Sequence, residues 1–214
     1  MKITIDHRFF SFLSAIIDYF REIGNHSIKL FYHFKAFLTY NNGIKNEGET
    51  MVDFTYHNPT KIEFGKDKEK LIGTALAQNG IKKVLLCYGS ERIKSDGLYA
   101  KITQSLQAQG ISWIDFSGIV SNPTLSKVHE GIALAKKEHV DAIVAVGGGS
   151  VLDSSKTIAT GALYDKDVWD FFIGEAKVKE TIPVGVILTF PATGSEASMG
   201  SVITNEQGPY KLAV

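Results

Sequence analysis

DAIVAVGGGS, residues 141–150, runs directly into VLDSSKTIATGAL, residues 151–163, and the strongest evidence for the fold class comes from these two segments. The apolar run at 142–146 has no polar alternation, which is typical of a strand buried on both faces in a parallel sheet. Three glycines follow, and then Ser150, a residue type that often caps the N-terminus of a helix. The second segment continues with apolar and small residues at helical spacing. We therefore predict a strand, a glycine turn and a helix that begins at the turn.

The glycine turn is a candidate site for a phosphate or pyrophosphate. Without Cβ atoms the backbone can approach a ligand closely. The N-terminus of the following helix also offers unpaired N–H groups and the positive end of the helix dipole. The turn matches neither G-x-G-x-x-G nor G-x-x-x-x-G-K-[ST]. A turn that only joins a strand closely to a helix is the alternative that this segment leaves open.

The composition limits the class of partner and the compartment. The chain has 214 residues, enough for one large domain or for one domain with an extension. Its 23 basic and 23 acidic side chains leave no net field that would draw it to nucleic acid, so we expect no nucleic-acid partner. The single cysteine, Cys87, lies in an apolar run and is interpreted as a small buried hydrophobe. It can form no internal disulfide, which favours a reducing compartment such as the cytoplasm.

Residues 1–50 differ in pattern from the rest and are predicted to form a helical extension with a linker. Apolar residues recur at helical spacing over 9–23 and again over 28–38, and a polar stretch follows at 41–50. The first apolar run is too short for a bilayer, which needs about 20 apolar residues. It also lacks a small-residue cleavage site. We expect an extension with no role in the chemistry, such as upstream sequence ahead of a start at Met51; attachment to a membrane surface is the alternative.

From residue 51 onward, strands and helices alternate with short connections. Strands are predicted at 54–56, 61–64, 83–88, 112–116, 142–146, 182–190 and 201–204, and helices at 67–78, 97–109, 125–138 and 151–163. This alternation predicts an α/β fold for residues 51–214, with a Rossmann-like, doubly wound parallel sheet.

In such sheets ligands bind at the carboxyl ends of the strands. Two of these ends, after Tyr88 and after Val146, carry glycine turns. A pocket that spans both would hold an adenosine ribose near residues 89–92 and a pyrophosphate at 148–150. Thr189, at the end of a later strand, and Thr193, just after it, would add hydroxyl groups for ribose or phosphate, although they are equally able to satisfy local backbone groups.

Several ordered motifs resemble those of the iron-containing (group III) alcohol dehydrogenases, most closely the butanol dehydrogenase type. They are NPT at 58–60, FG at 64–65, NPT at 122–124, VGGGSVLD at 146–153, Lys156, DVWD at 167–170 and LTFPATGSE at 188–196. The resemblance covers residues 51–214. It implies an N-terminal dinucleotide-binding domain, NAD or NADP as hydride carrier, and a primary alcohol or aldehyde such as butanol or butyraldehyde as substrate. It also implies an all-helical C-terminal domain that holds iron or zinc, and a homodimer for the full-length family.

The resemblance assigns cofactor-binding roles to particular residues. Gly148, Gly149 and Ser150 would hold the pyrophosphate. Asp153 would lie near the nicotinamide, while Thr189 and Thr193 would contact phosphate and ribose. Lys211 matches a cofactor-contacting lysine of relatives, and Ser198 stands where some relatives have asparagine.

The first glycine turn leaves the choice between NAD and NADP open. Many relatives have GGGS where this chain has GSER at 89–92, which makes Gly89, Ser90 and Arg92 candidates for the adenosine end. Arg92 would receive a 2′-phosphate, because guanidinium geometry suits that group. Glu91 would instead accept a hydrogen bond from a free 2′-hydroxyl.

The resemblance places the metal ligands, one aspartate and three histidines, in the helical domain, and the sequence ends at Val214 before the region that matches it. We predict no catalytic or metal-binding residue in this chain, and none of its six histidines is expected to be a ligand. Without a Lewis acid the alkoxide that gives up hydride is not stabilised, so we expect no turnover.

Three alternatives remain open. The chain is the N-terminal half of a metal-dependent alcohol dehydrogenase, a stand-alone dinucleotide-binding module without catalysis, or an unstable truncated product. We also predict that Gly149→Val abolishes dinucleotide binding, because a branched side chain would stand against the pyrophosphate.

Overall fold

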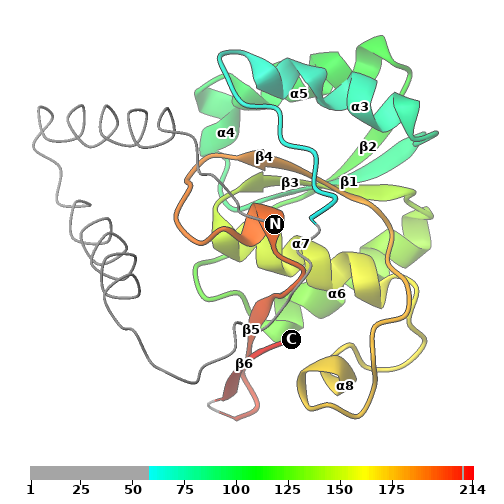
Figure 1. The fold of residues 1–214 in the computed structure, drawn as a ribbon, viewed down its shortest axis with the longest axis vertical. Coiled ribbons are helices and arrows are strands. Elements are labelled where there is room, and N and C mark those ends of the chain that lie inside the picture. Colours follow the sequence, from blue (N-terminus) through cyan, green and yellow to red (C-terminus); the bar gives the residue numbers. More distant parts are fainter. Residues whose placement is uncertain (1–57, 209) are drawn as a thin grey trace, which may run out of the picture. The chain divides into compact units, whose positions relative to one another are not determined.

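The computed structural model describes residues 58–208 and 210–214, and its centre is a four-stranded parallel sheet with helices on both faces (Figure 1). The strands are β1 Lys83–Tyr88, β2 Ser112–Phe116, β3 Ala142–Gly147 and β4 Val184–Leu188, in the spatial order β2-β1-β3-β4. The α-helices are α3 Ile72–Gln78, α4 Arg92–Ser95, α5 Leu98–Ala108, α6 Leu125–Glu138, α7 Gly149–Gly161 and α8 Trp169–Phe172. Two 3-10 turns, η1 Lys68–Leu71 and η2 Ser195–Ala197, and an antiparallel hairpin of β5 Val202–Asn205 and β6 Tyr210–Ala213 complete the elements. The predicted Rossmann-like α/β class is confirmed.

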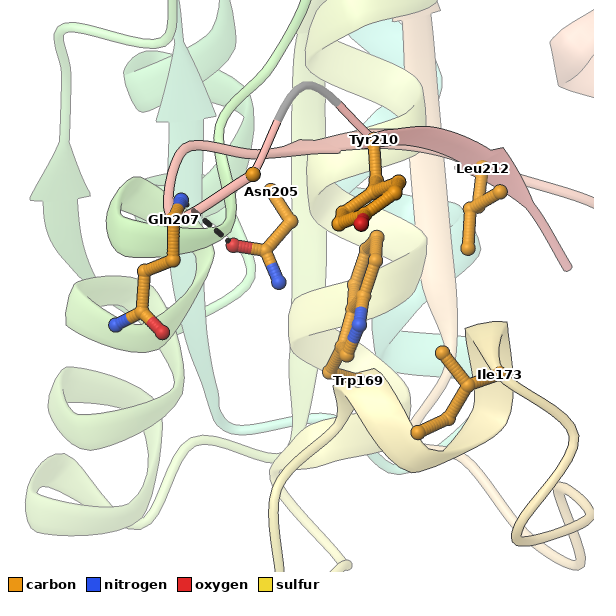
Figure 2. A pocket seen from close by; sticks show the side chains of 7 residues that line it. Trp169, Ile173, Asn205, Gln207, Tyr210 and Leu212 are labelled. Atoms are coloured by element: carbon orange, nitrogen blue, oxygen red, sulfur yellow. Dashed lines mark hydrogen bonds between the residues drawn. The ribbon is translucent and has the colours of Figure 1, made fainter.

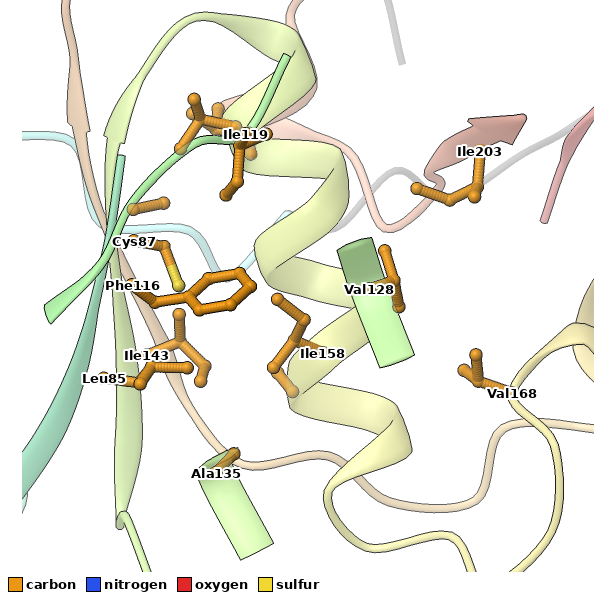
Figure 3. Packing of buried hydrophobic residues seen from close by; sticks show 14 of the residues in the cluster. Leu85, Cys87, Phe116, Ile119, Val128, Ala135, Ile143, Ile158, Val168 and Ile203 are labelled. Atoms are coloured by element: carbon orange, nitrogen blue, oxygen red, sulfur yellow. The ribbon is translucent and has the colours of Figure 1, made fainter. Parts of the chain in front are cut away.

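The two faces of the sheet carry two separate hydrophobic cores. Val84 and Leu86 of β1 point toward α3 and α5, whereas Leu85 and Cys87 point toward α6 and α7. Figure 3 shows the second core, where Cys87 lies beside Phe116 of β2. A strand buried on both faces needs apolar residues at every position, which explains why the sequence shows no alternation.

α6 and α7 cover the same face and approach each other closely through glycines. A Cβ on Gly131 of α6 would lie 2.4 Å from Cδ1 of Ile158, and a Cβ on Gly161 of α7 would lie 2.3 Å from Cδ1 of Ile132. Each isoleucine therefore fills the space that a glycine leaves on the other helix. This reciprocal contact fixes the position of α7, the helix that follows the glycine turn.

Several sequence predictions need correction. Residues 61–64 form no strand, because an alternating pattern makes a strand only where a neighbouring strand pairs with it, and none of the described ladders includes them. The helix predicted at 67–78 is divided into η1 and α3, and Asp67, which precedes η1, has left-handed backbone angles (φ 60°). The short helices α4 and α8 and the strand β6 were not predicted.

Some predictions fall outside the residues that the structure describes. These are the helical extension over 1–50 and the strand at 54–56. The boundary between residues 50 and 51 likewise stays a prediction. The residues from 58 onward belong to one compact unit by their own contacts.

Candidate functional site

The two glycine turns lie next to each other at the point where the strand order reverses. β1 and β3 are neighbours, with Tyr88 opposite Val146, so both strands end at the same level. The chain continues from β1 to β2 on one side of this pair, and β4 lies on the other side. In open α/β sheets, ligands bind in the crevice at such a switch point. The structure thus brings together the two turns that the sequence singled out.

The second turn ends in the N-terminus of a long helix. Gly148 has extended backbone angles, and its carbonyl oxygen accepts hydrogen bonds from the N–H groups of Val151 (3.0 Å) and Leu152 (3.2 Å). α7 therefore begins at Gly149, and the predicted N-cap, Ser150, is wrong, because it is already the second residue of the helix. The first N–H groups of a helix have no partner within it and carry the positive end of its dipole. An anion at the carboxyl ends of β1 and β3 would meet these groups.

Packing within the protein explains why two of the three positions in this turn are glycine. A Cβ on Gly147 would lie 2.6 Å from Cγ2 of Val151, and one on Gly149 would lie 2.7 Å from Oγ1 of Thr193. At Gly148 the nearest atom would be Cβ of Phe190 at 3.6 Å, which is an ordinary contact. None of the three has a positive φ. Close packing therefore accounts for Gly147 and Gly149, and contact with a ligand stays a prediction for all three.

The first turn contacts the loop that follows β2. The N–H of Gly118 donates to the carbonyl oxygen of Gly89 (2.8 Å), and a Cβ on Gly89 would lie 3.0 Å from the carbonyl oxygen of Ile119. Ser90 is exposed, as are Glu91 and Arg92. The carboxylate of Glu91 lies 2.7 Å from Nζ of Lys94, which holds the pKa of Glu91 below its usual range. No ion pair of Arg92 is found among the described residues.

The loop after β4 returns to the glycine turn. The N–H of Thr189 donates to the carbonyl oxygen of Gly147 (3.0 Å), and the side chain of Thr193 lies against Gly149. The hydroxyl of Thr193 accepts a hydrogen bond from the N–H of Ser195 (3.3 Å). Thr193 therefore does satisfy a local backbone group, yet its hydroxyl proton stays available for another acceptor.

Asp153 and Lys156 lie one turn apart on α7 and face the same loop. The carboxylate of Asp153 accepts hydrogen bonds from the hydroxyl of Ser195 (2.6 Å) and the N–H of Val202 (3.1 Å), and it lies 3.7 Å from Nζ of Lys156. The ammonium of Lys156 donates to the carbonyl oxygens of Ser195 (3.1 Å), Ser198 (3.2 Å) and Gly200. Burial lowers the pKa of Lys156, and the negative charge of Asp153 opposes this shift. No role was predicted for Lys156 from the sequence, where its i, i+3 spacing from Asp153 was the available signal.

The two remaining predicted residues lie on the far part of this loop and on the hairpin. The Ser198 hydroxyl accepts from the N–H of Gly200 (3.1 Å), and Ser198 is exposed. Lys211 is on β6, and its ammonium donates to Oδ1 of Asn122 (2.8 Å), in the loop before α6. The contacts of Lys211 are thus with this loop rather than with the glycine turns.

Two hollows lie beside the hairpin, one between it and α8 and the other between it, α6 and α8. The first, of about 450 Å³, is lined by Trp169, Ile173, Asn205, Gln207, Gly208, Tyr210 and Leu212 (Figure 2). The second, of about 340 Å³, includes His129, whose Nε2 lies 2.9 Å from a carboxylate oxygen of Asp167. Neither hollow is lined by any of the predicted cofactor residues. The candidate site therefore rests on the two glycine turns and the N-terminus of α7, and neither hollow lies there.

The described residues do not supply a metal site. Over 58–208 and 210–214, no group of three His, Cys, Asp or Glu side chains could hold a metal ion. This part of the chain does not fit the metal that the resemblance implies. In the same part, no helix is long and apolar enough to cross a membrane.

Comparison with known proteins identifies the family. The family model described as iron-containing alcohol dehydrogenase matches residues 59–214. The chain belongs to this family. A probable NADH-dependent butanol dehydrogenase of Bacillus subtilis is 44% identical over 155 residues, which are 72% of this chain and 40% of that protein. The NADPH-dependent aldehyde reductase of Escherichia coli is 35% identical over 76% of this chain and 42% of its own length.

A solved structure of the family shares both sequence and fold with this chain. The NADH-dependent butanol dehydrogenase A of Thermotoga maritima is 48% identical, with a TM-score of 0.75, over 77% of this chain and 41% of that one. The chain thus spans about two fifths of the length of the relatives it matches. Its described α/β unit corresponds to one portion of these enzymes.

Proposed function

We propose that this chain is the dinucleotide-binding portion of an NAD(P)-linked, metal-dependent alcohol dehydrogenase of the butanol type. The complete enzyme would interconvert a primary alcohol and its aldehyde by hydride transfer. The observation that carries the proposal is the pair of glycine turns at the switch point between β1 and β3, one of which opens the N-terminus of α7. The names of the butanol dehydrogenases from Bacillus subtilis and Thermotoga maritima support the substrate class.

The cofactor would extend across the crevice from the first turn to the loop after β4. In this arrangement the N-terminus of α7 binds the pyrophosphate and the first turn binds the adenosine ribose. The nicotinamide ribose lies toward Asp153. The residues that we assign to the cofactor are Gly89, Ser90, Arg92, Gly148, Gly149, Ser150, Asp153, Thr189, Thr193, Ser198 and Lys211.

We propose NADH rather than NADPH as the preferred carrier. The butanol dehydrogenases that are 44% and 48% identical to this chain are named as NADH-dependent. The ionised carboxylate of Glu91 also supports this choice, since it would repel a 2′-phosphate and accept a hydrogen bond from a 2′-hydroxyl. Arg92 would instead favour NADPH, because its guanidinium suits the 2′-phosphate. The ratio of the Kd values for NADH and NADPH therefore decides between the two cofactors.

Titration of the 214-residue chain with NADH, followed by nucleotide fluorescence, tests the proposal. We expect saturable binding, weaker binding of NADPH, and an unfolding free energy that rises by about 2.7 kcal/mol at NADH concentrations of 100 times Kd. Absence of binding by a cooperatively folded chain would refute the proposed function. An aggregated chain without a cooperative melt would instead support the unstable-product alternative.

A turnover assay on the same preparation addresses catalysis separately. We predict no reduction of butyraldehyde by NADH with this chain, with or without added iron or zinc, because the described residues provide no group that could hold the metal. Steady turnover would contradict this prediction while leaving the dinucleotide site intact.

The buried, unpaired Cys87 supports a reducing compartment such as the cytoplasm.

A further inference from the structure

The ammonium of Lys156 on α7 binds one loop through hydrogen bonds. It donates to three carbonyl oxygens, those of Ser195, Ser198 and Gly200, which belong to a single run of six residues. Three converging carbonyl dipoles and a nearby carboxylate form the kind of surrounding that usually holds a cation. Here the cation is a side chain of the helix itself.

Asp153 completes the attachment from the same face of α7. One of its carboxylate oxygens accepts a hydrogen bond from the Ser195 hydroxyl, and the other accepts one from the N–H of Val202. Asp153 therefore binds the beginning of the run at Ser195 and the chain just beyond its end at Val202. The side chains of Asp153 and Lys156 are only 16% and 18% exposed. A partly buried ion pair whose members are both hydrogen-bonded resists separation, because removing one partner leaves the other charge uncompensated.

The run that Lys156 binds, residues 195–200, adjoins residues that the proposed function assigns to the cofactor. Thr193 lies two positions before Ser195 and accepts from its N–H, while its own side chain rests on Gly149 at the start of α7. Ser198 is inside the run, with its carbonyl oxygen turned toward Lys156 and the residue as a whole exposed. The direction of the backbone carbonyls toward α7 therefore determines which groups of this loop face outward.

We propose that Lys156 is a positioning residue for the cofactor: its ammonium holds residues 195–200 in the conformation that presents Thr193 and Ser198 to the nicotinamide half of the dinucleotide. This inference rests on the proposed function. Lys156 itself would touch no cofactor atom. Its effect passes through the three carbonyl groups that it binds.

The test compares three variants of the full chain. Lys156→Met keeps an unbranched apolar stem of similar reach and removes the ammonium group. Lys156→Arg keeps the charge. Thr157→Val is the matched control, because it removes a different buried hydrogen bond between α7 and the same region, the one between the hydroxyls of Thr157 and Ser201 (2.7 Å), and leaves the three carbonyl contacts in place.

Two ligands separate the positioning role from a general loss of stability. NADH reports on the whole site, whereas ADP lacks the nicotinamide riboside and reports on the phosphate and adenosine ends. For Lys156→Met we expect the NADH Kd to rise about tenfold or more and the ADP Kd to change less than about twofold; a tenfold change corresponds to 1.4 kcal/mol. Lys156→Arg should recover most of the NADH affinity, and Thr157→Val should bind NADH within about twofold of the native chain.

Several outcomes would overturn the inference. They are native NADH affinity in Lys156→Met, equal weakening of NADH and ADP, or a loss in Thr157→Val as large as that in Lys156→Met. If Lys156→Met does not fold, Lys156→Gln carries the test, because its amide can still donate two hydrogen bonds to the carbonyls without a charge. A native chain that binds neither ligand would refute the proposed function itself, which distinguishes the two failures.

Discussion

Gly149 has no room for a side chain, because Thr193 lies against it. Alanine at this position would bring a Cβ to 2.7 Å from Oγ1 and 2.9 Å from Cγ2 of Thr193. We expect Gly149→Ala to lower the unfolding free energy by about 1–3 kcal/mol, as overpacking does, and Gly149→Val to lower it more. Thr193→Ala removes both close atoms, so the double variant should regain most of the stability in a denaturant titration.

The same pair tests whether Gly149 also faces the pyrophosphate. If it does, Gly149→Ala/Thr193→Ala stays defective in NADH binding although it is stable, because the added methyl group would still stand against the pyrophosphate. Thr193→Ala alone is the control for the lost hydroxyl. Equal NADH affinity in the double variant and in Thr193→Ala would show that Gly149 serves only the packing of the loop.

Cys87 should be chemically inert in the folded protein. It is fully buried in the core beneath α6 and α7, and desolvation raises the pKa of its thiol to about 12, with a small opposing effect from the Ser155 hydroxyl. Three pH units above the ordinary value of 9.0 correspond to about 1000-fold less thiolate. At pH 8 we expect labelling by a thiol reagent to be slow in the native chain and fast in denaturant. Fast labelling of the native chain would contradict the burial of this residue.

The raised pKa also makes stability depend on pH in a defined direction. The folded state holds the thiol proton more tightly than the unfolded state. The contribution of the protonated thiol to the free energy of unfolding is therefore complete below pH 9 and is lost as the pH rises toward 12. Cys87→Ala removes it. The difference in unfolding free energy between the native chain and Cys87→Ala should therefore shrink over this alkaline range.

Among the helices, the contact between α6 and α7 depends on two glycines: Ile158 packs against Gly131, and Ile132 packs against Gly161. Gly131→Ala should destabilise the fold by about 1–3 kcal/mol, because the new Cβ would lie 2.4 Å from Cδ1 of Ile158. Ile158→Val removes that methyl group at a cost of about 0.5–1.5 kcal/mol on its own. The double variant should lose less than the sum of the two single changes.

A matched cycle uses the other face of the sheet. Ile102 of α5 is also fully buried, but it belongs to the opposite core. Ile102→Val combined with Gly131→Ala should give additive losses of unfolding free energy. Additivity in the Ile158 pair as well would mean that α6 and α7 adapt to the added methyl group by moving apart.

The elements were largely predictable from the sequence because their signals are local. The uninterrupted apolar runs predicted β1 and β3, and the spacing over 125–138 predicted α6 with the observed bounds. Contacts between distant segments were not predictable. The packing of Thr193 on Gly149 and the hold of Lys156 on three carbonyls join residues about 40 positions apart, and no local pattern encodes such pairs. The motif resemblance named candidate residues but did not reveal that Asp153 is already hydrogen-bonded by the protein.

At the scale of the whole molecule, the division between residues 50 and 51 predicts an independent cofactor-binding unit. Limited trypsin digestion of the full chain, followed by mass spectrometry, tests it. We expect the smallest resistant product to retain residues 58–214, which form one compact unit by their contacts, and to bind NADH with the Kd of the undigested chain. A resistant product cut within 58–208, or a loss of NADH affinity after removal of the first 45 residues, would contradict the predicted division.

The last residue of the sequence is paired into the protein. The N–H and carbonyl oxygen of Val214 exchange hydrogen bonds with those of Ser201, both at 3.0 Å, and a Cβ on the adjacent Gly200 would lie 2.9 Å from the Val214 carbonyl oxygen. Any polypeptide joined at this point, whether a natural continuation or an affinity tag, would emerge beside the run that Lys156 fastens. A purification tag is therefore better placed at the other terminus. A fluorophore attached after Val214, in contrast, would report whether the surroundings of this loop change when NADH is added.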